Sequence, residues 1–284
     1  MVQLSMDERS QPQPDLTTTL HDRNFYGENS LIYPVLSRRV NGLSVGINTS
    51  PSKLCNFGCI YCEVNRNVEG LTRFNADLAD VQLRDVLAEI KGGSLGDQPI
   101  KAITLSGDGE PTSLMNFEDV IRRVIATRDE FGLADAKLVV ISNASGLHRE
   151  TVKRGLALMD DHNGELWAKL DAGTEDYYHR IAQTKFPFSK VLSNILETSQ
   201  KRPIKIQTCF MNVHGEMPPP DEIQAYSDRI NHITANGGQI SAVQLYTVSR
   251  PPAESYVTAL TDDQMDQVGQ TLQERIAIPI EVYK

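Results

Sequence analysis

Six short β-rich runs alternate with longer amphipathic stretches along this chain of 284 residues. The runs occupy positions 43–48, 101–107, 137–143, 165–173, 204–212 and 241–249. Between them lie helical patterns such as LADVQLRDVLAEIKGG and FEDVIRRVIATRDEFG, the second of which closes with a glycine stop. This rhythm predicts an α/β fold built on a parallel sheet, either doubly wound or rolled into a barrel.

Within the later runs, the side chains divide into an apolar face and a polar face. Gln207 and Cys209 share a face opposite Ile204 and Ile206. In the last run, Gln244 and Tyr246 share a face opposite Val243 and Leu245. A parallel sheet covered by helices on both faces would instead read as near-continuous apolar runs. Two interpretations remain: strands with one solvated face, or an open barrel whose interior holds a polar ligand.

The organisation of the chain favours one domain. No linker rich in Gly, Ser or Pro divides it, so we predict a disordered tail at 1–20 and a single domain over 21–284. We expect the roughly forty residues before the first run to pack outside the barrel or remain mobile. The segment TDDQMDQVGQTLQERIAIPIEVYK predicts a helix followed by a final β-like run.

Composition constrains the cellular location and the partners of the protein. The chain contains no apolar stretch long enough for a transmembrane helix, and its N-terminus lacks the basic start and apolar centre of a secretory signal. These features predict a cytoplasmic protein. The net charge of −9 disfavours nucleic acid as a partner, because binding to a phosphate backbone needs a basic face.

Three of the four cysteines form C-x3-C-x2-C directly after the first run, at Cys55, Cys59 and Cys62. Structural zinc sites use four closed ligands, and a thioredoxin-like pair would leave Cys55 unexplained. An iron–sulfur cubane held by three thiolates keeps one iron free for a small molecule. The spacing therefore predicts a thiolate site with one open position.

The motif, with Tyr61 directly before its third cysteine, resembles the cluster motif of the radical S-adenosylmethionine enzymes. The resemblance implies a partial (β/α)6 TIM-like barrel whose three cysteines hold a 4Fe–4S cluster, with Tyr61 beside the cofactors. In that family the free iron chelates S-adenosylmethionine, whose reductive cleavage gives a 5′-deoxyadenosyl radical that abstracts hydrogen from substrate. An external one-electron donor of the flavodoxin or ferredoxin type is implied as well. The polar strand faces predict a polar substrate.

Two loops after later runs carry residues suited to S-adenosylmethionine. SGDGEPT at 106–112 is similar to the family's Gly-Gly-Glu element, in which Gly107 and Gly109 would let the backbone approach the ammonium group and Glu110 would accept from it. Asp108 is an insertion relative to that element and belongs to the same predicted cofactor loop. The alternative for this stretch is an acidic β-turn.

The second loop is ISNASG at 141–146. The resemblance implies that Ser142 and Asn143 contact the ribose hydroxyls, since both side chains donate and accept hydrogen bonds. Asn and Ser are also favoured helix N-caps, so a purely structural role is the alternative.

Five polar residues complete the predicted pocket as catalytic candidates: Lys169, Asp171, Gln207, Tyr246 and Arg250. Lys169 and Asp171 fall where the family places groups near the methionine carboxylate and the substrate, and an internal ion pair is the alternative. Arg250 suits a carboxylate or phosphate, and a surface position ahead of the rigid turn at Pro251 is the alternative. Cys209 is either a small buried hydrophobe or a radical relay.

The lead-in YPVLSRRVNGLSVGIN is similar to that of enzymes related to the tRNA wybutosine-synthesising group, in which a serine and paired arginines precede the first strand. No cysteine precedes Cys55, so the second cluster of the wybutosine branch has no N-terminal ligands here. A wybutosine-type tRNA-modifying enzyme, a glycyl-radical-enzyme activase and a non-catalytic metal-binding module remain as alternatives.

Overall fold

One eight-stranded sheet forms the centre of the protein, with strand order β1-β2-β3-β4-β5-β6-β8-β10. The computed structural model describes residues 30–64, 73–95, 98–252 and 254–284, so the predicted tail at 1–20 lies outside the described residues. The sheet strands are β1 (Ile32–Ser37), β2 (Gly42–Ile47), β3 (Ile100–Leu105), β4 (Lys137–Ser142), β5 (Gly164–Lys169), β6 (Ile204–Cys209), β8 (Ile240–Tyr246) and β10 (Ile280–Tyr283). A separate antiparallel pair joins β7 (Asn212–Val213) to β9 (Val257–Thr258).

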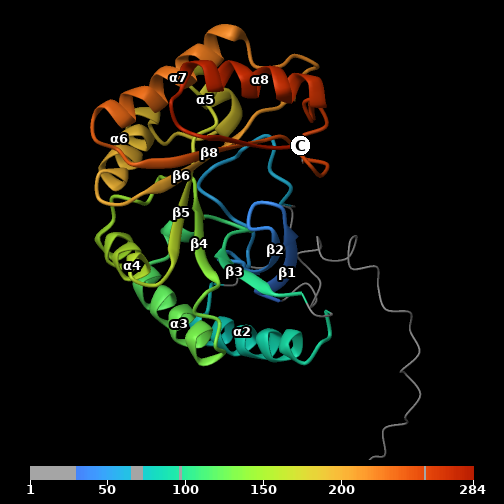
Figure 1. Ribbon diagram of the computed structural model, residues 1–284, viewed down its shortest axis with the longest axis vertical. Helices are drawn as coiled ribbons and strands as arrows, with labels where there is room; N and C mark the ends of the chain where they lie inside the picture. The colour runs from blue at the N-terminus through green and yellow to red at the C-terminus, as the bar shows by residue number, and fades with distance from the viewer. Residues whose placement is uncertain (1–29, 65–72, 96–97, 253) are drawn as a thin grey trace, which may run out of the picture.

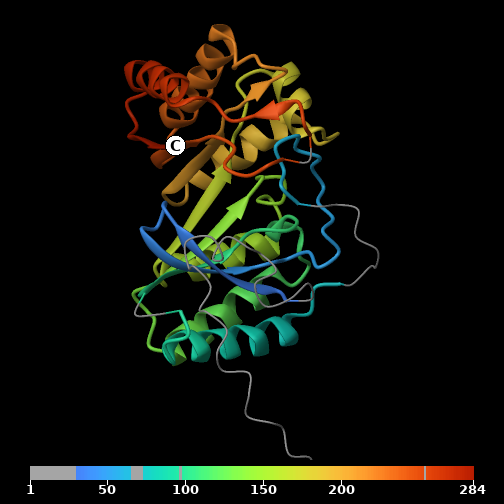
Figure 2. The same ribbon diagram turned by 90° about the vertical axis from the view of Figure 1, so that its right-hand side faces the viewer.

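Every neighbouring pair from β2 to β10 is parallel, and only β1 runs antiparallel to its neighbour. All six predicted runs are strands of this sheet, which curls into a half-barrel (Figures 1 and 2). The predicted partial α/β barrel is confirmed. The sheet is wider than the predicted six strands, because β10 extends the parallel series and β1 adds an antiparallel edge.

The structure corrects the expectation for the segment that precedes the first predicted run. Residues 32–37 do not pack outside the barrel but form β1, the edge strand that pairs with β2 from Ile32↔Ile47 to Ser37↔Gly42. Pro34 lies within this strand, and proline is tolerated there because an edge strand leaves one row of N–H positions without a ladder partner. The same proline weakens the strand signal in the sequence.

Helices cover the outer, convex face of the sheet. Figure 1 shows them in an arc from α2 around to α8. The α-helices are α2 (Ala76–Lys91), α3 (Phe117–Glu130), α4 (Glu150–Asp160), α5 (Glu175–Ala182), α6 (Phe188–Ser199), α7 (Pro220–Ala235) and α8 (Asp262–Arg275), with a 3-10 turn at Pro111–Ser113. Within the described ranges, none of the helices is both long and apolar enough to cross a membrane.

The predicted C-terminal helix and final strand are confirmed as α8 and β10. A reciprocal capping box fixes the start of α8, in which the Thr261 hydroxyl accepts from the Gln264 N–H and the Gln264 side chain accepts from the Thr261 N–H. The buried face of α8 then packs its apolar side chains into the main core, which lies between the sheet and the helices. This packing places β10 beside β8.

The inner, concave face of the sheet carries a second and much smaller apolar cluster. Ala102, Val139 and Trp167 form it, and Val40 from the β1–β2 turn packs against them. Beyond this cluster the inward side chains become polar toward the carboxyl ends of the strands. Because parallel strands end at one shared edge, the loops that follow β2, β3, β4 and β5 meet there.

Candidate functional site

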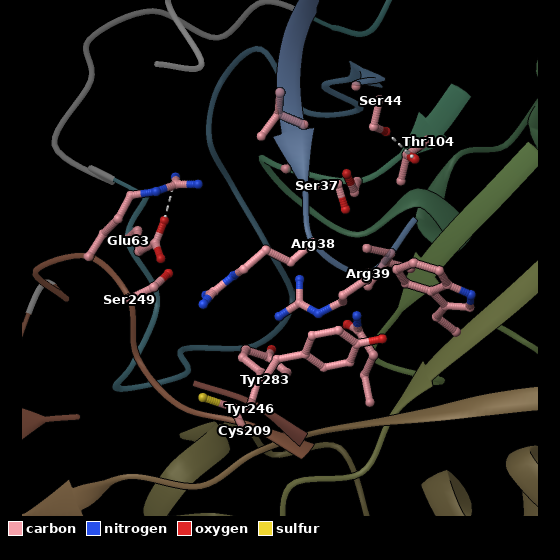
Figure 3. A pocket seen from close by; sticks show the side chains of 18 of the residues that line it. Ser37, Arg38, Arg39, Ser44, Glu63, Thr104, Cys209, Tyr246, Ser249 and Tyr283 are labelled. Atoms are coloured by element: carbon pink, nitrogen blue, oxygen red, sulfur yellow. Dashed lines mark hydrogen bonds and ion pairs between the residues drawn. The ribbon is translucent and has the colours of Figure 1, made fainter. Parts of the chain in front are cut away.

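A cavity of about 330 Å³ lies within the half-barrel (Figure 3). Inward side chains from successive strands line it, among them Ser44, Thr104, Lys169, Gln207 and Tyr246. The polar faces recognised in the sequence therefore face an interior cavity rather than open solvent. This result supports the interpretation as an open barrel with a polar interior.

The cysteine loop follows β2 and is held in place by helix α5. The Gly58 N–H donates to the Ala182 carbonyl and the Ile60 N–H to the Ile181 carbonyl, both at 2.9 Å. Phe57 inserts beneath the loop with its ring 6.0 Å from that of Tyr178. Because α5 and this aromatic contact hold the middle of the loop in place, the backbone that carries the cysteines is packed against the rest of the protein.

All three cysteines of the motif are free thiols; Cys55 is exposed, and Cys59 and Cys62 are half-buried. The Phe57 N–H donates to the Cys55 sulfur at 3.5 Å, and hydrogen bonds to sulfur tune the potential of thiolate-bound clusters. Desolvation, followed by the nearby Asp171 carboxylate, raises the pKa of Cys59 to about 12. An electropositive cluster would favour the thiolate form of these residues.

The donor set suits a polynuclear cluster. Within the described ranges, no three His, Cys, Asp or Glu side chains gather closely enough to hold a single metal ion. A cubane takes each thiolate on a different iron, so three cysteines spread over one short loop match it without converging on a point. A closed structural zinc site would instead need four converging ligands.

The Gly-Asp-Gly-Glu loop follows β3 and packs against the cysteine loop. Gly107 has φ +92° and lines the cavity, where an added Cβ would lie 2.3 Å from the Asn48 side-chain oxygen. The Asp108 N–H donates to that oxygen at 3.1 Å, and the Asp108 side chain is buried. Asn48, which sequence reasoning missed, therefore holds this loop to the end of β2.

Glu110 is 4% exposed and accepts four hydrogen bonds from the protein itself. The donors are the N–H and hydroxyl of Thr112, the Ser142 hydroxyl at 2.7 Å and the Asn143 N–H at 2.7 Å. Burial raises the pKa of Glu110 even though these hydrogen bonds act to lower it. In this arrangement Glu110 joins the loop after β3 to the end of β4.

Replacing Gly109 by alanine is expected to lower the free energy of unfolding by about 2–4 kcal/mol, since strain at positive φ and a steric clash add together. Gly109 has φ +85°, and an added Cβ would lie 2.3 Å from the Ser50 Cβ in the cysteine loop. Gly93→Ala is the matched control, because Gly93 has φ +90° with nothing within 4 Å. Urea unfolding measures both variants. Equal losses would contradict the clash with the cysteine loop.

Ser142 and Asn143 lie at the carboxyl end of β4 but do not cap the helix that follows. Arg149 is the N-cap position of α4, so the alternative of an N-cap role for these residues is wrong. The Asn143 amide donates to the Asn56 side-chain oxygen at 2.9 Å, and Asn56 donates to the Ser145 hydroxyl at 2.8 Å. Asn56 was missed from the sequence, although its position directly after Cys55 places it within the motif.

Lys169 and Asp171 form the ion pair that the sequence left as an alternative. Their side chains lie 3.1 Å apart and are 14% and 15% exposed. Asp171 also accepts from the Tyr61 hydroxyl at 2.6 Å and from the Cys209 N–H at 2.8 Å, while Lys169 donates to the Tyr246 hydroxyl at 2.6 Å. This network joins the cysteine loop to β5, β6 and β8.

The protonation states within this network follow from burial and the ion pair. Burial lowers the pKa of Lys169, but the Asp171 carboxylate and Tyr246 together outweigh it and hold that pKa above its usual range. Burial, with the Asp171 charge next, raises the pKa of Tyr61. Lys169 is thus a cation and Tyr61 a neutral phenol at neutral pH.

The two remaining candidates, Gln207 and Arg250, have partners within the protein. Gln207 lines the cavity and donates to the Gln244 side-chain oxygen at 3.1 Å. Arg250 is not a free surface residue: it lines the cavity and pairs with Glu63, just past the third cysteine, at 2.7 Å. Sequence reasoning missed Glu63, because nothing local links it to a residue so far along the chain.

Comparison with known proteins identifies the family. Residues 49–225 match the model of the radical SAM superfamily, and that segment is more than half of the chain. The protein belongs to the radical SAM superfamily. The match begins just before the cysteine motif and extends through α5, α6 and β6 into α7. It therefore includes the cysteine loop and much of the cavity wall.

Its relatives in sequence are distant. The chain is 26% identical over 251 residues to a protein of Brachyspira hyodysenteriae named GTPase Obg, covering 88% of this chain but 34% of that protein. It is 25% identical over 226 residues to a UPF0026 protein of Methanocaldococcus jannaschii, covering 79% of this chain and 65% of the relative. The chain thus spans from about a third to about two thirds of the length of these relatives.

Two solved structures share the fold. SuiB of Streptococcus suis, solved bound to S-adenosylmethionine, has a TM-score of 0.61 at 13% identity and covers 87% of this chain and 52% of that one. Archaeal TYW1 has a TM-score of 0.51 at 13% identity, with 87% and 84% covered. At this identity the likeness concerns the fold.

Proposed function

We propose that this protein is a radical S-adenosylmethionine enzyme that abstracts hydrogen from a polar small molecule held in the half-barrel. The observation that carries the proposal is the meeting of the thiol motif with the cavity: Tyr61, Cys62 and Glu63 line it together with the polar strand face. Cys55, Cys59 and Cys62 would hold the 4Fe–4S cluster. When bound, the cluster and S-adenosylmethionine supply the one-electron cleavage that yields a 5′-deoxyadenosyl radical.

The residues of the chain contribute position and charge. Lys169 presents a cation to the cavity, and Tyr246 stays a neutral hydroxyl beside it, its pKa raised to about 12 by burial although the Lys169 charge lowers it. Gln207 and Ser44 supply further polar groups from other strands. Gly107 lets the loop after β3 approach the same space. These groups suit the orientation of a polar substrate in a concave site.

The proposal includes an external one-electron donor. Cys55 is exposed, so a cluster on this loop would have one edge open to a docking protein of the flavodoxin or ferredoxin type. The other two cysteines are half-buried. Cys62 lines the large cavity, and Cys59 lines a second, smaller cavity of about 30 Å³ that also contacts Tyr61. One side of the cluster would then receive electrons while the other faces substrate.

The test is anaerobic reconstitution with iron and sulfide, followed by reduction with dithionite in the presence of S-adenosylmethionine. We expect release of 5′-deoxyadenosine and methionine in equal amounts, measured by liquid chromatography with mass spectrometry. Protein that carries a full complement of iron and releases neither product would overturn the proposal. Tight binding of zinc in place of iron would instead favour a metal-binding module.

A further inference from the structure

The charges that line the large cavity do not balance. Its Arg, Lys, Asp and Glu side chains are four cations and one carboxylate: Arg38, Arg39, Lys169, Arg250 and Glu63. Asp171 neutralises Lys169 at 3.1 Å, and Glu63 neutralises Arg250 at 2.7 Å. Among the described residues, no carboxylate lies in ion-pair range of Arg38 or Arg39. In a chain with a net charge of −9, the cavity is thus a positive site with two arginines available.

Both arginines come from the turn between β1 and β2, at positions 38–41. Val40 anchors this turn by packing against the small apolar cluster inside the half-barrel. The Arg39 guanidinium carbon lies 4.2 Å from the centre of the Tyr246 ring and 5.7 Å from that of Tyr283. In Figure 3 Arg39 lies beside the tyrosine side chains, whereas Arg38 extends in another direction within the same cavity. Arg39 is therefore held by aromatic faces from β8 and β10.

This packing leaves part of the Arg39 guanidinium unsatisfied. Its Nε atom is buried and has no hydrogen-bond partner among the described residues. Contact with aromatic rings engages the flat face of a guanidinium but leaves the in-plane N–H groups free. A buried N–H without an acceptor is unfavourable, and two oxygens of one carboxylate or phosphate fit the guanidinium fork.

We infer that Arg39, with Arg38 lining the same cavity, binds an anionic oxygen group of the substrate, so that the substrate is a small molecule carrying a carboxylate or phosphate. The assignment of this ligand as the substrate rests on the proposed function. The cavity volume of about 330 Å³ is at the lower end of the range for small-molecule sites, which suits a small metabolite.

The same geometry orients the substrate. Arg39 enters from the turn before β2, whereas the cysteine loop follows the other end of that strand. Tyr246 connects the two regions: its ring contacts Arg39, and its hydroxyl accepts from Lys169. The ion-pair partner of Lys169, Asp171, accepts in turn from Tyr61 in the cysteine loop. With its anionic group on Arg39, the substrate would extend past Tyr246 toward Tyr61 and Cys62, where hydrogen abstraction is proposed.

Isothermal titration calorimetry of the reconstituted holoprotein with inorganic phosphate and with succinate tests the inference and separates the two anion types. We expect saturable binding of at least one of them. Arg39→Gln should weaken it by about tenfold or more, as expected for loss of a charge-assisted bidentate contact, and Arg39→Lys should weaken it less. The matched control is Arg122→Gln on the exposed face of α3, which removes one positive charge outside the cavity and should leave binding unchanged.

Fluorescence locates the binding site within the molecule. Trp167 is the single tryptophan of the chain and lines the cavity, so anion binding there should change its emission in parallel with the calorimetric signal. Circular dichroism checks that each variant is folded. If Arg39→Gln does not fold, the titration is carried out with Arg38→Gln in its place. We expect this substitute to weaken binding as well, since both arginines face the same cavity.

Two outcomes would overturn the inference: no saturable binding of either anion at tens of millimolar, or a folded Arg39→Gln protein that binds as tightly as the unaltered one. The titration uses neither reductant nor S-adenosylmethionine. Failure of anion binding and failure of 5′-deoxyadenosine release are therefore observed separately.

Discussion

The Cys59→Ala variant is expected to lose more than about a hundredfold of the 5′-deoxyadenosine release, because replacing even outer-shell groups at metal sites lowers affinity or activity by about 10- to 100-fold. Cys59 is the middle ligand of the motif, and its carbonyl accepts from the Cys62 N–H at 3.1 Å. A cluster with only two protein ligands would lose iron during reduction. Iron content and the visible absorbance of the cluster should fall together with product release.

The chain offers a matched control at its fourth cysteine. Cys209 is buried at the end of β6 and lies outside the motif, so Cys209→Ala removes one thiol from the chain without removing a predicted ligand. We expect its iron content after reconstitution to equal that of the unaltered protein. Loss of iron in Cys209→Ala but not in Cys59→Ala would contradict the assignment of the cluster to the loop after β2.

Alternation along the strands made much of the fold predictable. Side chains of a strand alternate in direction, so one polar and one apolar face in each of several runs left either a solvated face or an interior site, and the cysteine motif favoured the interior site. Placement of Lys169, Gln207 and Tyr246 around one cavity followed from this period and from the shared edge where parallel strands end. Such features depend on local spacing, which a sequence displays directly.

Contacts between distant segments were not predictable in the same way. Arg39 lines the cavity because β1 forms an antiparallel edge strand and the turn after it packs over the interior of the half-barrel. Pro34 weakened the strand signal of β1, so the sequence did not predict this strand. Glu63 and Arg250 are paired across 187 positions of sequence. No local pattern reports a contact of that kind, since it depends on how the whole sheet curls.

The hydrogen-bond partners of Glu110 were also not predictable from the sequence. Its position after two glycines suggested a ligand for the ammonium group of S-adenosylmethionine. The structure shows that its carboxylate already accepts from Thr112, Ser142 and Asn143. A buried carboxylate must be satisfied whether or not a ligand is bound, and the sequence does not state which donors fold around it. The contact with S-adenosylmethionine stays a prediction.

Asp171→Asn is expected to lower the free energy of unfolding by about 3–5 kcal/mol, the range found when one partner of a buried ion pair is removed. The reason is that Lys169, only 14% exposed, would keep its charge without a countercharge beside it. The neutral amide would also hold the Tyr61 hydroxyl and the Cys209 N–H more weakly than the carboxylate does. Urea unfolding followed by circular dichroism measures the loss.

The double variant Lys169→Met with Asp171→Asn distinguishes the cost of leaving one buried charge unpaired from the cost of changing the side chains at these positions. Removing both charges leaves no buried ion to solvate, so we expect it to recover much of the stability that Asp171→Asn alone loses. Because Lys169 faces the cavity and Tyr61 lies in the cysteine loop, the recovered protein should still fail to release 5′-deoxyadenosine at the unaltered rate. Stability restored together with full release would mean that this pair serves folding alone.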